Sequence, residues 1–175
     1  VHARHGISAG MDGERTELNA QGRPVQRAQV ENLYVEAMLL ADEAHAAFAA
    51  QRDLSLRNDG APMGDALAQV SLACESLKTT TRLMHIIAWL LSQRAWQRGE
   101  IGDADVADEK YRLGRATATD PGIAGDFPFA ARSLIEASQE LYGRVARLEE
   151  RMLSPDAPLA DSPARALMDR LNTAF

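Results

Sequence analysis

The sequence predicts an all-α protein: an antiparallel three-helix bundle with long helices and flexible N- and C-terminal segments. Three long stretches repeat their apolar residues with the period of an amphipathic helix, and no stretch alternates like a strand. The chain has 175 residues, 46% of them hydrophobic, which suits one domain with a buried core. We therefore expect residues 23–153 to form the bundle, between a disordered segment 1–22 and a flexible tail 154–175.

The first predicted helix begins near Pro24 and ends before the Asn-, Gly- and Pro-containing stretch 57–64. Proline suits a first helical turn because its missing N–H is not needed there. Apolar residues then recur at alternating spacings of four and three, which places them on one face of the helix. The predicted core residues of this helix are Leu33, Ala37, Leu40, Ala44 and Ala47, with Tyr34, Ala41 and Phe48 beside them.

The second predicted helix runs from about Asp65 to Arg98, and Gly99 is a plausible C-cap. One apolar stripe recurs along it with a seven-residue period, and we interpret that stripe as the side facing the core. Cys74 would then be a small core residue rather than a reactive thiol. The stripe consists of Val70, Leu77, Met84 and Leu91, interleaved with Cys74, Thr81, Ala88 and Ala95.

Residues 100–128 predict a connection with an acidic cluster and a possible short helix near 104–113. A connection of this length is expected to cover part of the bundle or to be mobile. The third helix is predicted at 129–153, and a short amphipathic helix at 163–175 with Ser162 as its N-cap. The predicted core residues of the third helix are Leu134, Ser138, Leu141, Val145, Leu148 and Met152.

Charge and composition exclude several classes of function. The formal net charge is −6, which argues against a nucleic-acid binder, because phosphate contacts need clustered lysines and arginines. A single cysteine allows no disulfide within the chain and fits a reducing cytoplasm. The apolar run 83–91 is far shorter than the roughly 20 residues that span a bilayer, and no secretory signal is evident. We expect a cytoplasmic protein without membrane insertion.

No motif in the sequence predicts catalysis, a cofactor or a metal site. The stretch GISAG around Ser8 matches a nucleophile elbow, but that motif needs a strand-to-helix turn and no strand is predicted. Asp103 and Asp105 have the spacing of a calcium loop, yet Ala107 and Asp108 stand where a further ligand and the invariant glycine belong. A solvated acidic loop is the better interpretation. We expect a protein that is not an enzyme.

Two histidines leave one signalling function open. His45 and His85 each lie on a predicted bundle helix, as the phosphoacceptor of a histidine phosphotransfer domain does. Neither is followed by the Lys-Gly pattern of those domains, so a partly exposed histidine on a helix flank is the simpler interpretation of each. Histidine phosphotransfer stays an alternative, as does a purely structural helical dimer.

The second helix carries more apolar surface than one core-facing stripe requires. Around Met84 the apolar arc is about 200° wide, whereas an ordinary stripe is a little over 100° wide. Tryptophan and arginine are enriched where proteins bind one another, which singles out the side of this arc beyond the heptad stripe. The predicted dimer or partner surface comprises Arg82, Ile86, Trp89, Leu90, Gln93 and Trp96.

We expect this surface to contact another chain, either in a homodimer or with a protein partner. On that hypothesis, Trp89→Glu or Ile86→Glu leaves helicity intact and converts a dimer into a monomer. Two alternatives stay open: the connection 100–128 covers this side, or the side lines a ligand pocket.

Three stretches carry a resemblance to a known family: NLYVEAMLLADEAHAAF, CESLKTTTRLMHIIAWLLSQRAWQRGEI and SLIEASQELYGRVARLEERM. Together they resemble the alphaproteobacterial family of the regulator of CtrA degradation, RcdA, long described as a domain of unknown function. The resemblance covers roughly residues 25–153. Its most specific positions are Glu75, Ser76, Leu77, Thr80, Thr81, Arg82, Leu83, Met84, Ala88, Trp89 and Leu90.

The resemblance implies a dimeric three-helix bundle with a flexible C-terminal tail and no catalytic activity. It also implies an adaptor of the ClpXP protease, acting with the response regulator CpdR to deliver cell-cycle substrates such as CtrA. It does not indicate which surface meets which partner, and the tail 154–175 lies outside the matching stretches.

Overall fold

Three long helices dominate the protein. The computed structural model describes residues 10–56, 63–125 and 127–154. The long helices are α1 (Gly10–Leu56), α2 (Met63–Gln97) and α5 (Phe129–Leu153). Between α2 and α5 lie α3 (Asp103–Val106), a 3-10 turn (Glu109–Tyr111) and α4 (Pro121–Ala124). The described ranges contain no strand, so the predicted all-α class is confirmed.

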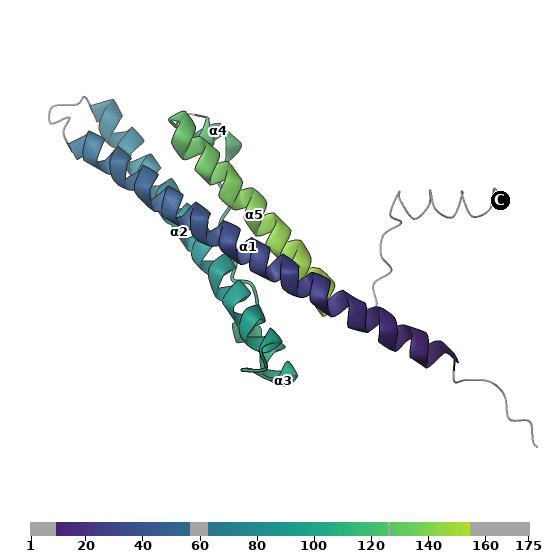
Figure 1. Ribbon diagram of the computed structural model, residues 1–175. Coiled ribbons are helices and arrows are strands. Elements are labelled where there is room, and N and C mark those ends of the chain that lie inside the picture. The colour runs from purple at the N-terminus through teal and green to yellow at the C-terminus, as the bar shows by residue number, and fades with distance from the viewer. Residues whose placement is uncertain (1–9, 57–62, 126, 155–175) are drawn as a thin grey trace, which may run out of the picture.

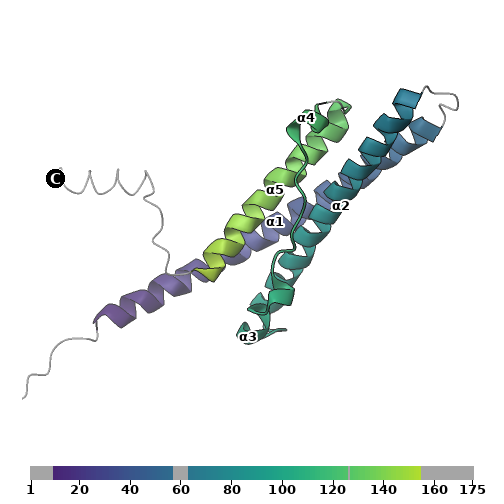
Figure 2. The same ribbon diagram turned by 180° about the vertical axis from the view of Figure 1, so that it is seen from behind.

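Helices α2 and α5 both run opposite to α1 and are therefore parallel to each other, as Figure 1 shows. Arg94, near the end of α2, contacts Glu31 and Tyr34 of α1, whereas Leu72 and Phe48 line the same groove at the opposite end. Helices α1 and α2 are therefore antiparallel. Helix α5 runs antiparallel to α1 and beside α2, and α2 contacts both of the other long helices. Seen from behind in Figure 2, the chain between α3 and α4 runs back along α2 and α5.

The predicted helix boundaries are close at most ends. Helix α5 has the predicted bounds, and α2 begins and ends within two residues of its prediction. Helix α1 is longer than predicted, because it continues back to Gly10 through residues for which we expected disorder. The domain boundaries stay predictions. Residues 1–9 and 155–175 lie outside the described residues, and with them Ser8 and the short helix predicted at 163–175.

Gly99 caps α2 as predicted. Its φ is +74°, a left-handed conformation that glycine adopts without a Cβ clash. The Glu100 N–H donates to the Ala95 carbonyl at 2.9 Å, and the Gly99 N–H donates to the Trp96 carbonyl at 2.9 Å. This pair of bonds is a Schellman motif, which satisfies carbonyls left free at a helix end. It ends α2 sharply and starts the connection to α3.

The core lies where the three long helices meet. Most of the core residues predicted on α1 and α5 are buried, and the rest of those two sets are half-buried. Those predictions are confirmed. The buried apolar residues of α1 are Val30, Leu33, Ala37, Leu40, Ala44 and Phe48, and those of α5 are Ala131, Ile135, Leu141, Val145 and Leu148.

The predicted core stripe of α2 is wrong. Its large members are exposed, with Leu77 at 68% and Met84 at 64% of their maximal exposure. Cys74 is exposed as well, so it is not a core residue. The α2 residues that fill the core are Leu83, Ile86, Trp89 and Leu90. Helix α2 is thus rotated relative to the prediction, because its apolar arc is wide enough to offer the core a choice of sides.

Candidate functional site

The partner surface predicted from the sequence faces the interior of the same chain. Exposure is 0% for Ile86 and Leu90 and 3% for Trp89, and Arg82 and Gln93 are buried too. Trp96 is half-buried, and its indole N–H donates to Asp103 Oδ1 at 2.6 Å. The prediction that these six residues form an exposed dimer or partner surface is therefore wrong. That side is mostly buried because helices α1 and α5 and residues 107–120 of the connection cover it.

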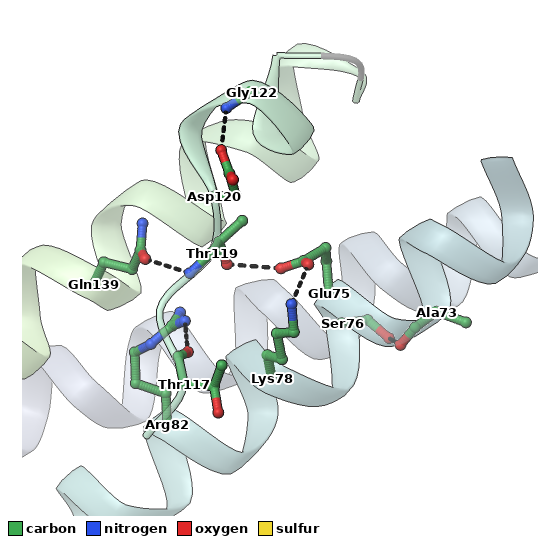
Figure 3. A network of polar contacts seen from close by, with 10 residues as sticks. All are labelled: Ala73, Glu75, Ser76, Lys78, Arg82, Thr117, Thr119, Asp120, Gly122 and Gln139. Carbon is green, nitrogen blue, oxygen red and sulfur yellow. Dashed lines mark hydrogen bonds and ion pairs between the residues drawn. The ribbon is translucent and has the colours of Figure 1, made fainter. Parts of the chain in front are cut away.

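A buried arginine holds the connection against the bundle. Arg82 donates from Nη1 to Ser138 Oγ of α5 at 2.5 Å. It also donates from Nη2 to the Thr117 carbonyl at 2.7 Å (Figure 3). Ser138 Oγ in turn donates to the Ile135 carbonyl at 2.7 Å. Burial lowers the pKa of the Arg82 guanidinium from its ordinary value, and the nearby charge of Glu75 opposes that shift. Arg82 therefore joins α2, α5 and the connection.

A second set of polar contacts holds the connection about two turns away along α2. Thr119 Oγ1 donates to Glu75 Oε2 at 2.7 Å, and Lys78 Nζ lies 2.6 Å from Glu75 Oε1. The Thr119 backbone N–H donates to Gln139 Oε1 of α5 at 2.7 Å. Glu75 is 2% exposed, and these bonds offset the cost of burying its charge. The open alternative that the connection covers this side of α2 is the one the structure supports.

Further contacts fix the remainder of the connection. The Tyr142 hydroxyl donates to the Gly114 carbonyl at 3.0 Å, and the Leu113 N–H donates to Glu149 Oε1 at 2.8 Å. Gly114 approaches the His85 ring so closely that a Cβ there would lie 2.8 Å from ring atoms. Glycine is required at this position because any side chain would push the connection away from α2.

The opposite side of α2 carries an apolar surface that no described residue covers. Nine residues follow one another at alternating spacings of three and four over the helix, and all are exposed except Ala95, which is half-buried. None of the nine is charged. We call them the α2 seam: Leu67, Val70, Cys74, Leu77, Thr81, Met84, Ala88, Leu91 and Ala95.

The seam has the pattern by which helices pair between chains. A strict seven-residue repeat sustained over three to four heptads is typical of a coiled-coil seam. Contiguous exposed apolar surface of this kind marks an interaction site, because leaving it in water forgoes stabilisation. Near Val70 the seam adjoins a groove of about 390 Å³ between α1 and α2, which Phe48, Leu72 and Ala73 also line. The candidate functional site is therefore a protein-binding face.

The heptad repeat of this seam was recognised in the sequence, but it was interpreted as the side of α2 that faces the bundle core. The heptad period is the signal that could have identified it, because a helix in a bundle core needs only a broad 3.6-residue stripe. The buried polar residues Arg82 and Gln93 misled the prediction, since their types favour a surface. The hydrogen-bonding partners of Arg82, which are Ser138 and the Thr117 carbonyl, lie in distant parts of the chain and cannot be read from α2 alone.

The histidines and aspartates considered as phosphoacceptor or calcium sites lie apart from one another or already form hydrogen bonds within the chain. His45 is exposed on α1, whereas His85 is half-buried beneath Gly114 and its Nδ1 has no hydrogen-bond partner among the described residues. Asp103 and Asp105 accept hydrogen bonds from Trp96 and from the Gly102 backbone. Among the residues that the structure describes, no three His, Cys, Asp or Glu side chains gather as metal ligands would.

An arginine-lined groove lies on another face. It has a volume of about 580 Å³ between α1 and α5 and is lined by Arg144, Arg147 and Arg151. Arg144 pairs with Glu36 of α1, which lies in the same groove. Within the described ranges, no helix combines the length and the apolar content that crossing a membrane requires.

Comparison with known proteins relates the chain to one family. A family model described as a protein of unknown function, DUF1465, matches residues 21–175. Among solved structures, the crystal structure of RcdA from Caulobacter crescentus CB15 has 32% sequence identity to this chain. That match covers 70% of this chain and 89% of the RcdA chain, with a TM-score of 0.49. No curated protein matches the sequence.

Proposed function

The chain belongs to the RcdA-like family described as DUF1465, and we propose that it is a non-enzymatic adaptor for regulated proteolysis. In this proposal it works in the cytoplasm as a homodimer. It holds cell-cycle substrates such as CtrA near the ClpXP protease, in a complex primed by the response regulator CpdR. The family resemblance supports these partners.

The uncovered α2 seam is the observation that carries the proposal. Folding of one chain buries the core and pins the connection, yet it leaves Leu67 at 76% and Val70 at 61% exposure. Single exposed apolar residues are ordinary on proteins, but a regular row of them along a helix is typical of a binding face. A protein whose main unsatisfied surface is a binding face is suited to assembling other proteins.

Adaptor function needs no chemistry from the chain itself. Binding a substrate and a protease at once makes their encounter intramolecular, and the effective concentration can reach the millimolar range for short connections. In the proposed homodimer the seam on α2 binds the second copy, and the arginine-lined groove between α1 and α5 stays accessible to another partner.

Histidine phosphotransfer is the second candidate, and the exposure of His45 favours it. A phosphoacceptor must be reached by a receiver domain, which His45 on α1 allows and the Gly114 contact of His85 hinders. His45 and the flanking Asp42 and Glu43 are all exposed. Their negative charges oppose a phosphoryl group by like-charge repulsion, so this function is the weaker of the two.

A reconstituted degradation assay tests the adaptor. Purified chain, ClpXP, CpdR and CtrA are combined, and the rate of CtrA loss is measured with and without the chain. We expect several-fold faster degradation and co-purification of the chain with the primed protease. His45→Ala is the matched control, because an adaptor retains its effect while a phosphotransfer protein loses it. Absence of both association and acceleration, with CpdR present, overturns the proposal.

A further inference from the structure

The sizes of the seam residues alternate along α2. The large members Val70, Leu77, Met84 and Leu91 recur every seven residues on one line of the helix. On the neighbouring line, which begins with Leu67, the side chains that follow are all small or medium in size. These are Cys74, Thr81, Ala88 and Ala95. From Val70 to Ala95 the seam therefore presents a line of large side chains beside a line of smaller ones.

This alternation distinguishes the two ways in which a second copy of α2 could pair with the first. Parallel helices bring identical positions together in each layer, so small residues would face small residues and leave voids. Voids remove contacts from the atoms that line them. Antiparallel helices bring the large line of one copy against the small line of the other. Every layer from Val70 to Ala95 then holds one large and one small side chain, which packs evenly over that stretch.

We propose that two copies of the chain pair through the α2 seam as antiparallel helices around a two-fold axis that passes between Arg82 and Leu83. This inference rests on the homodimer in the proposed function and specifies its interface. The layers then place four residues against partners in the second copy: Val70 against Ala95, Cys74 against Leu91, Leu77 against Ala88 and Thr81 against Met84. The two-fold symmetry repeats each pair, as an isologous interface requires.

Residues at the N-terminal end of the seam favour this register over the one shifted by a heptad toward that end. Shifting the pairing by one heptad places Leu67 against Leu91 of the second copy, so two large residues meet. The same shift brings Lys78 opposite Lys78 of the second copy, which is repulsive. In the proposed register Lys78 lies opposite His85 of the second copy, and Glu75 already pairs with Lys78 within its own chain. Size and charge therefore favour the same register.

The seam is long enough for a stable helix pair. At about 1.5 Å of rise per residue, the stretch from Val70 to Ala95 is roughly 40 Å long. It holds no charged side chain, so pairing would bury apolar surface without desolvating a charge on the seam itself. The small line also lets the two helix backbones approach closely, which increases the contact made by each large residue.

The native cysteine provides a test of orientation and register. Cys74 is the only cysteine in the chain and is exposed on the seam. In the proposed register it faces residue 91 of the second copy, in the shifted register residue 84, and in a parallel pair Cys74 itself. The wild type, Leu91→Cys and Met84→Cys are oxidised under mild conditions and compared on non-reducing gels. Circular dichroism checks helicity, and light scattering gives the mass before oxidation.

We expect Leu91→Cys to form a covalent dimer at least tenfold faster than the wild type or Met84→Cys. Fastest cross-linking of the wild type indicates a parallel pair and overturns the orientation, and fastest cross-linking of Met84→Cys overturns the register. A dimeric mass without cross-linking in any of the three overturns the seam as the interface. A monomeric wild type contradicts the homodimer itself, whereas loss of adaptor activity is measured separately in the degradation assay.

Discussion

At the scale of single residues, Arg82 shows how a charged side chain can be part of a bundle core. It is 1% exposed, and its guanidinium joins Ser138 of α5 to the Thr117 carbonyl of the connection. A buried charge is costly unless it is fully hydrogen-bonded, so Arg82 requires these partners as much as they require Arg82. Its role is to fasten the connection over the inward side of α2.

Removing the Arg82 side chain should destabilise the folded chain. For Arg82→Ala we expect the free energy of unfolding to fall by about 3 kcal/mol, because the buried Ser138 hydroxyl and the partly buried Thr117 carbonyl lose a charged partner. Urea denaturation followed by circular dichroism measures the change. Arg115→Ala is the matched control, since Arg115 is exposed in the same connection and should shift stability little. Equal midpoints for the two variants would contradict this role.

At the scale of the helix, α2 has two apolar sides with different tasks. One side, with Leu83, Ile86, Trp89 and Leu90, fills the bundle core, and the other is the exposed seam. Helices α1 and α5 need only one apolar face each, since each has a solvated side opposite the core. The excess apolar surface of α2 is thus explained by a core side and an interface side on one helix.

Charge substitutions on the two sides of α2 should therefore have opposite consequences. Ile86→Glu places a carboxylate where exposure is 0%, so we expect a loss of several kcal/mol in stability and a loss of helicity. Met84→Glu, only two residues away, lies on the exposed seam and should keep the helical signal. Thermal melts followed at 222 nm compare the two. A folded but monomeric Ile86→Glu variant would contradict this assignment and would support the interface predicted from the sequence.

At the scale of the whole molecule, a single folded chain leaves the apolar α2 seam exposed to water until another chain covers it. Dimerisation linked to folding makes the melting temperature rise with protein concentration. A protein that folds and functions as a monomer would instead show the same melting temperature at every concentration. The seam therefore predicts a property of the assembly that no single helix displays.

We expect the wild type to have twice the 19.0 kDa chain mass by size exclusion with light scattering. Leu77→Glu should shift it to the single-chain mass and abolish the concentration dependence of melting, because the substitution buries charge in a seam layer. Leu153→Glu is the matched control. Leu153 is also an exposed leucine, at 49%, but it lies at the end of α5 away from the seam. A dimeric Leu77→Glu protein would remove the seam from consideration.

The sequence by itself determined most boundaries of the three long helices and the core faces of two of them. Local periodicity gave the bounds of α5, the stripes of α1 and α5, and the glycine cap at Gly99. These features depend on residues within a few positions of one another, through helix geometry and backbone φ, so they can be read along the chain.

Only the tertiary structure decided which side of α2 faces the core. The apolar arc of α2 permits two orientations, and the choice depends on the connection docking onto it through Arg82, Glu75 and Thr119. Those contacts join residues more than 30 positions apart, so no local pattern contains them. Burying the side that finds hydrogen-bonding partners for its polar residues leaves the regular heptad side outward, and with it the surface available to a second molecule.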